Sequence, residues 1–207
     1  MEINLKYFRI YIEYIFLIVL FVCILSPKIA KILSNFYLCY LFILFHELSH
    51  VFVASILRKD IDKLNITLSG VSVSFKIKRY EIGNITTKLE LLKDIAVYLA
   101  GPISNLLLSF LFFKIELVFE INIFLAFLNF LPIYPLDGYN IINRLFRVFG
   151  INKVKASIIT DNISNFFIFV FILCSIFIFI YLKNFSFIIF SFYLLVLKYI
   201  NKKTLNF

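Results

Sequence analysis

Long apolar runs constrain this sequence more than any other feature. The run over residues 36–57 is long enough to cross a bilayer, which takes about 20 apolar residues in a helix. Hydrophobic residues make up 62% of the 207 residues, and the mean hydropathy is +0.98. This composition excludes most classes of soluble protein and is typical of an integral membrane protein.

The apolar runs predict six transmembrane helices in a single domain over residues 1–207. We read the first run as an uncleaved span and not as a signal peptide, because no small-residue cleavage site follows it. The fold class is therefore an all-α integral membrane protein. Its predicted spans are 10–25, 36–57, 95–113, 117–133, 157–182 and 185–200.

A different pattern lies between the second and third spans. Residues 66–78 alternate apolar and polar side chains with a period of two, and Ser69-Gly70 favours a turn. The segment predicts a small β-hairpin. Two interpretations remain open for it: a surface hairpin, or a sheet edge that binds an extended substrate peptide by strand addition.

The positive charge indicates how the chain lies in the membrane. A net charge of +9 could suggest nucleic acid, but the basic residues stand between the apolar runs, so anionic lipid is the better partner and no nucleic acid is expected. With six spans, 17 of the 21 Lys and Arg residues fall on one side and 4 on the other. Positive charge favours the cytoplasm, which predicts a multi-pass protein with both termini cytoplasmic.

The second span carries the sequence HELSH, with the only two histidines of the chain, His46 and His50. Residues four apart share one face of a helix, about 6 Å apart along the axis, and two neutral imidazoles so placed can hold one zinc ion. Glu47 follows the first histidine and is placed to act as a general base. The alternative is a chance pattern on a solvated helix face, which the apolar surroundings disfavour.

A third ligand is expected, because a hydrolytic zinc usually takes three protein groups and one water. Asp137 is the best candidate, in the stretch 129–138, where two prolines and a glycine break the fourth span near its end. The alternative is that Asp137 caps a helix over 139–149. The second and fourth spans are predicted to run in the same direction, so Asp137 and the histidines fall at the same depth, in the cytoplasmic half of the membrane.

Three motifs in this order resemble those of the site-2 protease family of intramembrane zinc metalloproteases. They are HELSH at 46–50, AGPISN at 100–105 and NFLPIYPLDG at 129–138. The resemblance implies a zinc metalloendopeptidase with one Zn²⁺ per chain and with Glu47 as the catalytic acid and base. The implied zinc ligands are His46, His50 and Asp137. The residues implied to shape substrate access are Asn129, Pro132 and Pro135.

The six-span layout without a PDZ insert resembles the branch that contains stage IV sporulation protein FB. This resemblance implies a protein of the bacterial cell membrane, a membrane-tethered substrate such as a pro-sigma factor, and membrane proteins as regulators. The family usually has Gly where Ser49 stands and Gly-Arg where Tyr139-Asn140 stand. The chain ends at Phe207 directly after the sixth span, so no CBS domain is expected. Two other classes remain as alternatives: a metal transporter, and an inactive homologue that acts as a scaffold.

Overall fold

The computed structural model describes residues 2–4, 9–14, 18, 33–59, 61–67, 70–75, 87–183 and 185–204. The chain divides into two compact units. The first is formed by Met1–Thr86 with Leu99–Ala126, and the second by Thr87–Tyr98 with Phe127–Phe207. Two helices, α5 (Lys88–Leu111) and α6 (Glu116–Phe130), each contribute residues to both units.

Helix α3 (Ser34–Ile56) is the long helix of the first unit, and it covers most of the predicted second span. Its sequence contains neither glycine nor proline, so nothing interrupts the backbone hydrogen bonds over its 23 residues. The helix ends at Ile56 with Leu57 as its C-cap, and the residue after the cap, Arg58, adopts the left-handed region with a φ of 55°.

A four-stranded sheet accompanies α3 in the first unit. Its order is β1-β2-β3-β4, formed by Glu2–Asn4, Arg9–Ile12, Ile61–Thr67 and Gly70–Phe75. Strands β3 and β4 are antiparallel, and Thr67 is opposite Gly70, which confirms the predicted hairpin. The turn was expected at Ser69-Gly70; Gly70 is the first residue of β4, and Leu68 and Ser69 lie outside the described residues.

The prediction of a first span over residues 10–25 is wrong at its N-terminal end. Residues 10–12 belong to β2, which pairs in parallel with β3, so that Ile10 is opposite Leu64. A salt bridge of 2.8 Å between Arg9 and Asp62 supports the same pairing. Ile10, Tyr11 and Ile12 suit a strand as well as a helix, and the distant partner strand decides between the two. Most of the rest of the range, 15–17 and 19–25, lies outside the described residues.

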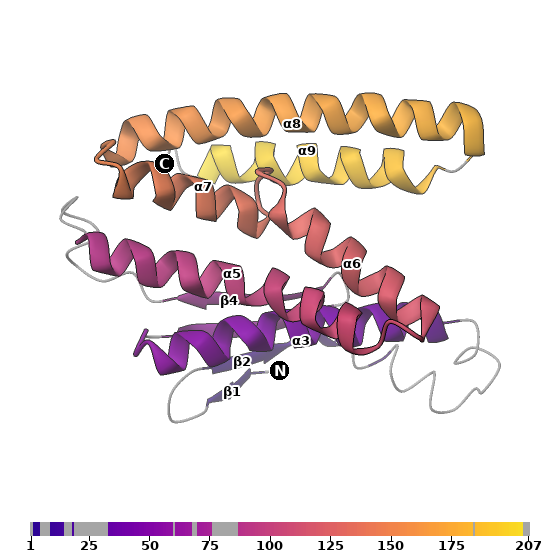
Figure 1. Cartoon of the computed structure of the whole chain (residues 1–207), viewed down its shortest axis with the longest axis horizontal. Coiled ribbons are helices and arrows are strands. Elements are labelled where there is room, and N and C mark those ends of the chain that lie inside the picture. Colours follow the sequence, from indigo (N-terminus) through magenta and orange to yellow (C-terminus); the bar gives the residue numbers. More distant parts are fainter. Residues whose placement is uncertain are drawn as a thin grey trace. The chain divides into compact units, whose positions relative to one another are not determined.

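Helix α3 packs against one face of the sheet (Figure 1). Tyr40 of the helix, Leu64 of β3 and Val71 of β4 form the buried centre of this contact. Tyr40 and its neighbours along one stripe of α3 follow the helical period of 3.6 residues, whereas the contributing strand residues follow the period of two. The side chains packed around this centre are Ile43, Leu44, Ile66 and Val73.

Helix α5 begins with the sequence pattern of a capping box, Thr87 followed three residues later by Glu90. The backbone N–H of Glu90 donates to the Thr87 hydroxyl at 3.3 Å, which satisfies one of the free donors of the first turn. Pro102 lies inside this helix, immediately after Gly101.

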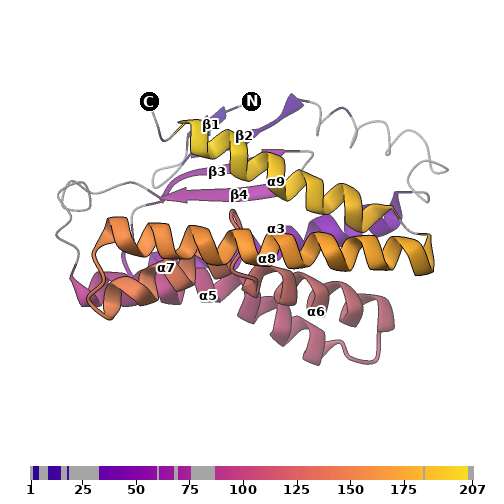
Figure 2. The same ribbon diagram turned by 90° about the horizontal axis from the view of Figure 1, so that it is seen from above.

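The second unit contains the predicted break between two helices. Helix α6 ends at Phe130, and α7 (Asp137–Val148) begins seven residues further on, with Ile133 fully buried in the intervening loop. Helices α8 (Lys153–Leu182) and α9 (Ser186–Thr204) lie side by side (Figure 2). The core of this unit joins the loop to both helices through Ile133, Ile168 and Leu194.

Three described helices are long and apolar enough to cross a membrane: Ser34–Ile56, Lys88–Leu111 and Lys153–Leu182. A shorter apolar helix, Ser186–Ile200, accompanies them, and α6 has only 15 residues. These helices support the predicted membrane protein class. The count of six spans stays a prediction.

Candidate metal centre

His46 and His50 lie one turn apart on α3 and are nearly inaccessible to solvent. Their exposed fractions are 4% and 5%. The ring centroids are 4.8 Å apart, and the ring planes cross at 85°. The i, i+4 spacing therefore brings the two imidazoles together on one face of the helix, as the sequence predicts.

Gly101 of α5 is the residue that makes room for the two histidines. A Cβ atom on Gly101 would lie 2.5 Å from Nε2 of both His46 and His50. Zinc–nitrogen bonds are about 2.0–2.1 Å long, so a Cβ at this place would compete for the space of any metal ion that both Nε2 atoms bind. The absence of a side chain at residue 101 is therefore a requirement of the site.

Asp137 is the first residue of α7, and Leu136 occupies the N-cap position. A carboxylate in the first turn is stabilised by the helix dipole. The next residue, Gly138, is closely packed, because a Cβ there would overlap the backbone carbonyls of Phe130 and Leu131. The Asp-Gly pair thus allows α7 to start directly against the end of α6.

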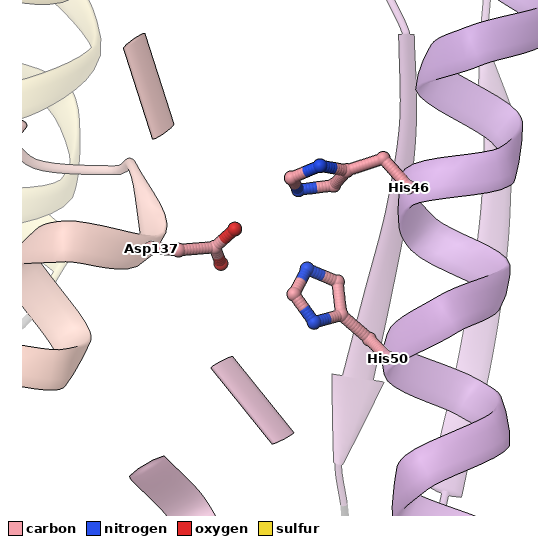
Figure 3. Close-up of side chains that lie close together, drawn as sticks. All are labelled: His46, His50 and Asp137. Atoms are coloured by element: carbon pink, nitrogen blue, oxygen red, sulfur yellow. The ribbon is translucent and has the colours of Figure 1, made fainter. Parts of the chain in front are cut away.

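The side chains of His46, His50 and Asp137 point toward one another (Figure 3). Each offers one ligand atom, and these three atoms lie within 4.8 Å of one another. Two imidazole nitrogens and one carboxylate oxygen are a donor set that catalytic zinc commonly takes. The chemistry of the donors, together with the space kept free by Gly101, fits a metal ion of this kind.

The other predicted site residues occupy different parts of the chain. Glu47 is half-buried on α3, directly after His46. Asn129 is in the last turn of α6. Pro132 is buried and Pro135 is exposed in the loop before α7, and the Tyr134–Pro135 bond is cis. Their roles in catalysis and substrate binding remain predictions.

The residues that depart from the family pattern all have partners in the described structure. The Ser49 hydroxyl donates to the Phe45 carbonyl at 2.8 Å, within its own helix. Asn140 accepts a hydrogen bond of 2.9 Å from Arg144. Tyr139 donates to Asp161 at 2.9 Å, and burial, followed by this hydrogen bond, raises the pKa of Tyr139 to about 12. The Tyr139 hydroxyl therefore keeps its proton near neutral pH and can donate this hydrogen bond.

Four residues of this region had no place in the site predicted from the sequence: Gly101, Tyr139, Asp161 and Ser164. Gly101 had a visible signal, since a Gly-Pro pair inside an apolar helix indicates close packing. Asp161 had a weaker signal, a carboxylate at the start of a long apolar run. Tyr139 stands two residues after Asp137, but nothing in the sequence connects it to Asp161, and nothing connects Ser164 to the metal-binding group.

The sequence matches no protein-family model and no curated protein. The structure is similar to a solved structure described as "Site-2 Protease from Methanocaldococcus jannaschii", with a TM-score of 0.61 and 18% sequence identity. The similarity covers 94% of this chain and 91% of the other. The chain therefore has the fold of that protease over nearly its whole length.

Proposed function

We propose that the protein is a zinc-dependent intramembrane endopeptidase. The observation that carries the proposal is the grouping of His46, His50 and Asp137, whose potential ligand atoms lie within 4.8 Å of one another. Support also comes from the apolar helices α3, α5 and α8 and from the similarity to a solved site-2 protease. Ionisable groups on such helices are costly and usually belong to a functional site.

The proposed chemistry assigns three residues to the metal and one to proton transfer. Zinc held by His46, His50 and Asp137 would polarise the scissile carbonyl and lower the pKa of a water toward about 7. Glu47 accepts the proton of the attacking water and then donates a proton to the leaving amine. Because Glu47 directly follows His46 on the helix, its carboxylate can reach a zinc-bound water but is poorly placed to be a ligand.

The proposed substrate is a membrane-tethered protein that is cut near the cytoplasmic face of the bacterial cell membrane. A helix shields its own carbonyl groups, so the substrate must be locally extended. Strand β4 is the last strand of the described sheet and packs on α3, which carries both histidines. An extended segment can add to this edge. Asn129, Pro132 and Pro135 would guide it.

The finer parts of the proposal follow from the motifs and the charge distribution. We assign six spans, with both termini in the cytoplasm, to a single protease domain. A pro-sigma factor released during sporulation is the substrate that the resemblance suggests, and membrane-protein regulators would accompany it.

The deciding experiment compares wild type with Glu47→Gln. Both proteins are purified in detergent, analysed for zinc, and reconstituted in liposomes with single-span reporters whose juxtamembrane segments are randomised. We expect equal zinc contents, cleavage of some reporters by wild type, and a loss of about 10²–10⁴-fold in rate for the variant.

Two results would contradict the proposal. Undiminished cleavage by Glu47→Gln would show that Glu47 is not the general base. Zinc-loaded wild type that cleaves no reporter but carries zinc across the liposome membrane would favour a transporter instead.

A further inference from the structure

Helix α8 carries a stripe of polar side chains where it faces α7 and the preceding loop. Thr160 and Ser164 are fully buried and one turn apart, and Asp161 lies beside them, half-buried. The helix is otherwise apolar over most of its 30 residues. Polar groups buried on such a helix cost free energy unless they are hydrogen-bonded, so the partners of this stripe are informative.

Asp161 and Ser164 bond to residues on the two sides of Asp137. The Tyr139 hydroxyl donates to Oδ1 of Asp161 at 2.9 Å, two residues after Asp137. The backbone N–H of Tyr134 donates to the Ser164 hydroxyl at 3.1 Å, three residues before Asp137. The segment that carries the carboxylate is thus attached to α8 at both ends.

Two further contacts stiffen this arrangement. The rings of Tyr134 and Tyr139 pack edge to face, with centroids 5.4 Å apart, so the two attachment points also support each other. The Lys198 ammonium of α9 donates to the backbone carbonyl of Asp161 at 3.2 Å. Asp161 is therefore the point at which α7, α8 and α9 meet through hydrogen bonds.

Other buried hydroxyls of α8 show what an uninvolved residue does. Ser175 is as buried as Ser164, and its hydroxyl donates to the Phe171 carbonyl of its own helix at 2.7 Å. Thr160 also donates to its own helix, to the Ala156 carbonyl, but it accepts a hydrogen bond from Asn143 of α7 at 3.5 Å as well, so it is not such a comparison. Ser164 instead accepts a hydrogen bond from a backbone N–H thirty residues earlier in the chain, in a loop that has no helical hydrogen-bond ladder of its own.

We propose that Asp161 and Ser164 are positioning residues for the metal centre, holding residues 134–139 so that the Asp137 carboxylate is presented to the ion in a fixed orientation. The proposal deepens the proposed function and rests on it. Groups that orient the ligands of a metal ion without binding the ion themselves typically contribute about 10–100-fold to metal affinity.

The test measures zinc affinity of the full-length protein in detergent by competition with a chelator. We expect Tyr139→Phe, Asp161→Ala and Ser164→Ala each to weaken zinc binding by about 10-fold or more. Asp161→Asn keeps the Oδ1 acceptor and should restore an affinity within about threefold of wild type. Tyr139→Phe combined with Asp161→Ala should cost no more than either change alone, because both remove the same hydrogen bond.

Ser175→Ala and Tyr181→Phe are the matched controls. Ser175 is an equally buried serine of α8, and Tyr181 is 70% exposed on the same helix. Both variants should bind zinc as wild type does. The visible spectrum of the cobalt-loaded proteins adds a readout of ligand geometry, which we expect to change in Asp161→Ala and to be unchanged in Ser175→Ala.

Distinct results overturn the inference and the proposed function. If wild type binds about one zinc and Tyr139→Phe, Asp161→Ala and Ser164→Ala bind it equally well, the inference is wrong and the function stands. An equal loss of zinc affinity in Ser164→Ala and Ser175→Ala would mean that both substitutions act by destabilising the protein in general. This result would also overturn the inference. If purified wild type binds no zinc, the proposed function fails, and the inference fails with it.

Discussion

At the scale of single residues, the candidate metal centre depends on the lack of a side chain at Gly101 as much as on the side chains of His46, His50 and Asp137. Both His46 and His50 direct Nε2 at Gly101. Asp137 is followed by a second closely packed glycine, Gly138. The potential metal ligands are therefore packed so closely that neither Gly101 nor Gly138 has space for a side chain.

Gly101→Ala should abolish zinc binding. The added methyl group would lie 2.5 Å from both Nε2 atoms, which is too close for any real contact, and it would occupy space that the ion needs. Zinc per purified chain, measured by elemental analysis, should fall from about one to nearly none. Ile103→Ala, at an exposed position of the same helix, is the control. A Gly101→Ala protein with unchanged zinc affinity would show that the ion does not lie at these nitrogens.

His46→Ala and Asp137→Ala should each lose zinc. Removing a direct ligand leaves two protein groups, so the loss in affinity should exceed the 10–100-fold that outer partners contribute. The measurement is zinc per chain and chelator competition, with Asp62→Ala as a control, since Asp62 pairs with Arg9 on the sheet. Loss with His46→Ala but not with Asp137→Ala would leave the metal in place and remove the third ligand.

At the scale of elements, α3 has two stripes of side chains, one that packs on the sheet and one that carries the two histidines. Tyr40, Ile43 and Leu44 pack on the sheet, whereas His46 and His50 lie on a neighbouring stripe that faces Gly101. One rigid helix thus connects the sheet to the histidines. If β4 receives a substrate strand, this helix fixes how far that strand lies from the histidines.

Leu64→Ala should lower the free energy of unfolding by about 2–5 kcal/mol, because Leu64 is only 4% exposed in the contact between α3 and the sheet. Leu41→Ala is the matched control, since Leu41 lies on α3 but is 50% exposed, and its effect should stay within about 0.5 kcal/mol. Denaturant titration of the purified proteins measures both. Equal effects of the two substitutions would mean that the sheet does not stabilise α3.

At the scale of the whole molecule, the fold resembles a site-2 protease over 94% of the chain, although only 18% of the residues are identical. A fold retained at such low identity must depend on the positions of apolar side chains more than on their identities. The proposed membrane orientation is a property of this scale, because it follows from the sum of charges over all connections.

The orientation can be tested by cysteine labelling in cells. We expect Lys183→Cys, in the connection between α8 and α9, to react with an impermeant maleimide added outside. Lys153→Cys, at the start of α8, should react only after the membrane is permeabilised. Both are made in a protein whose natural cysteines are replaced by serine. The reverse labelling pattern would place the termini outside and contradict the proposed cytoplasmic cleavage.

The sequence by itself determined the features that depend on local spacing. The i, i+4 histidines, the alternation that predicts the turn between β3 and β4 and the strand β4, the capping box of α5 and the proline-broken end of α6 are all local patterns. The first five residues of β3, Ile61 to Asn65, lie outside that alternation. Local patterns are readable because the helical and strand periods act on neighbouring side chains. Only the tertiary structure decided that residues 10–12 form a strand, that Gly101 faces the histidines and that α8 bonds both sides of Asp137. Each of these contacts joins segments at least twenty residues apart, where closing the chain costs entropy and the partner cannot be read from the local pattern.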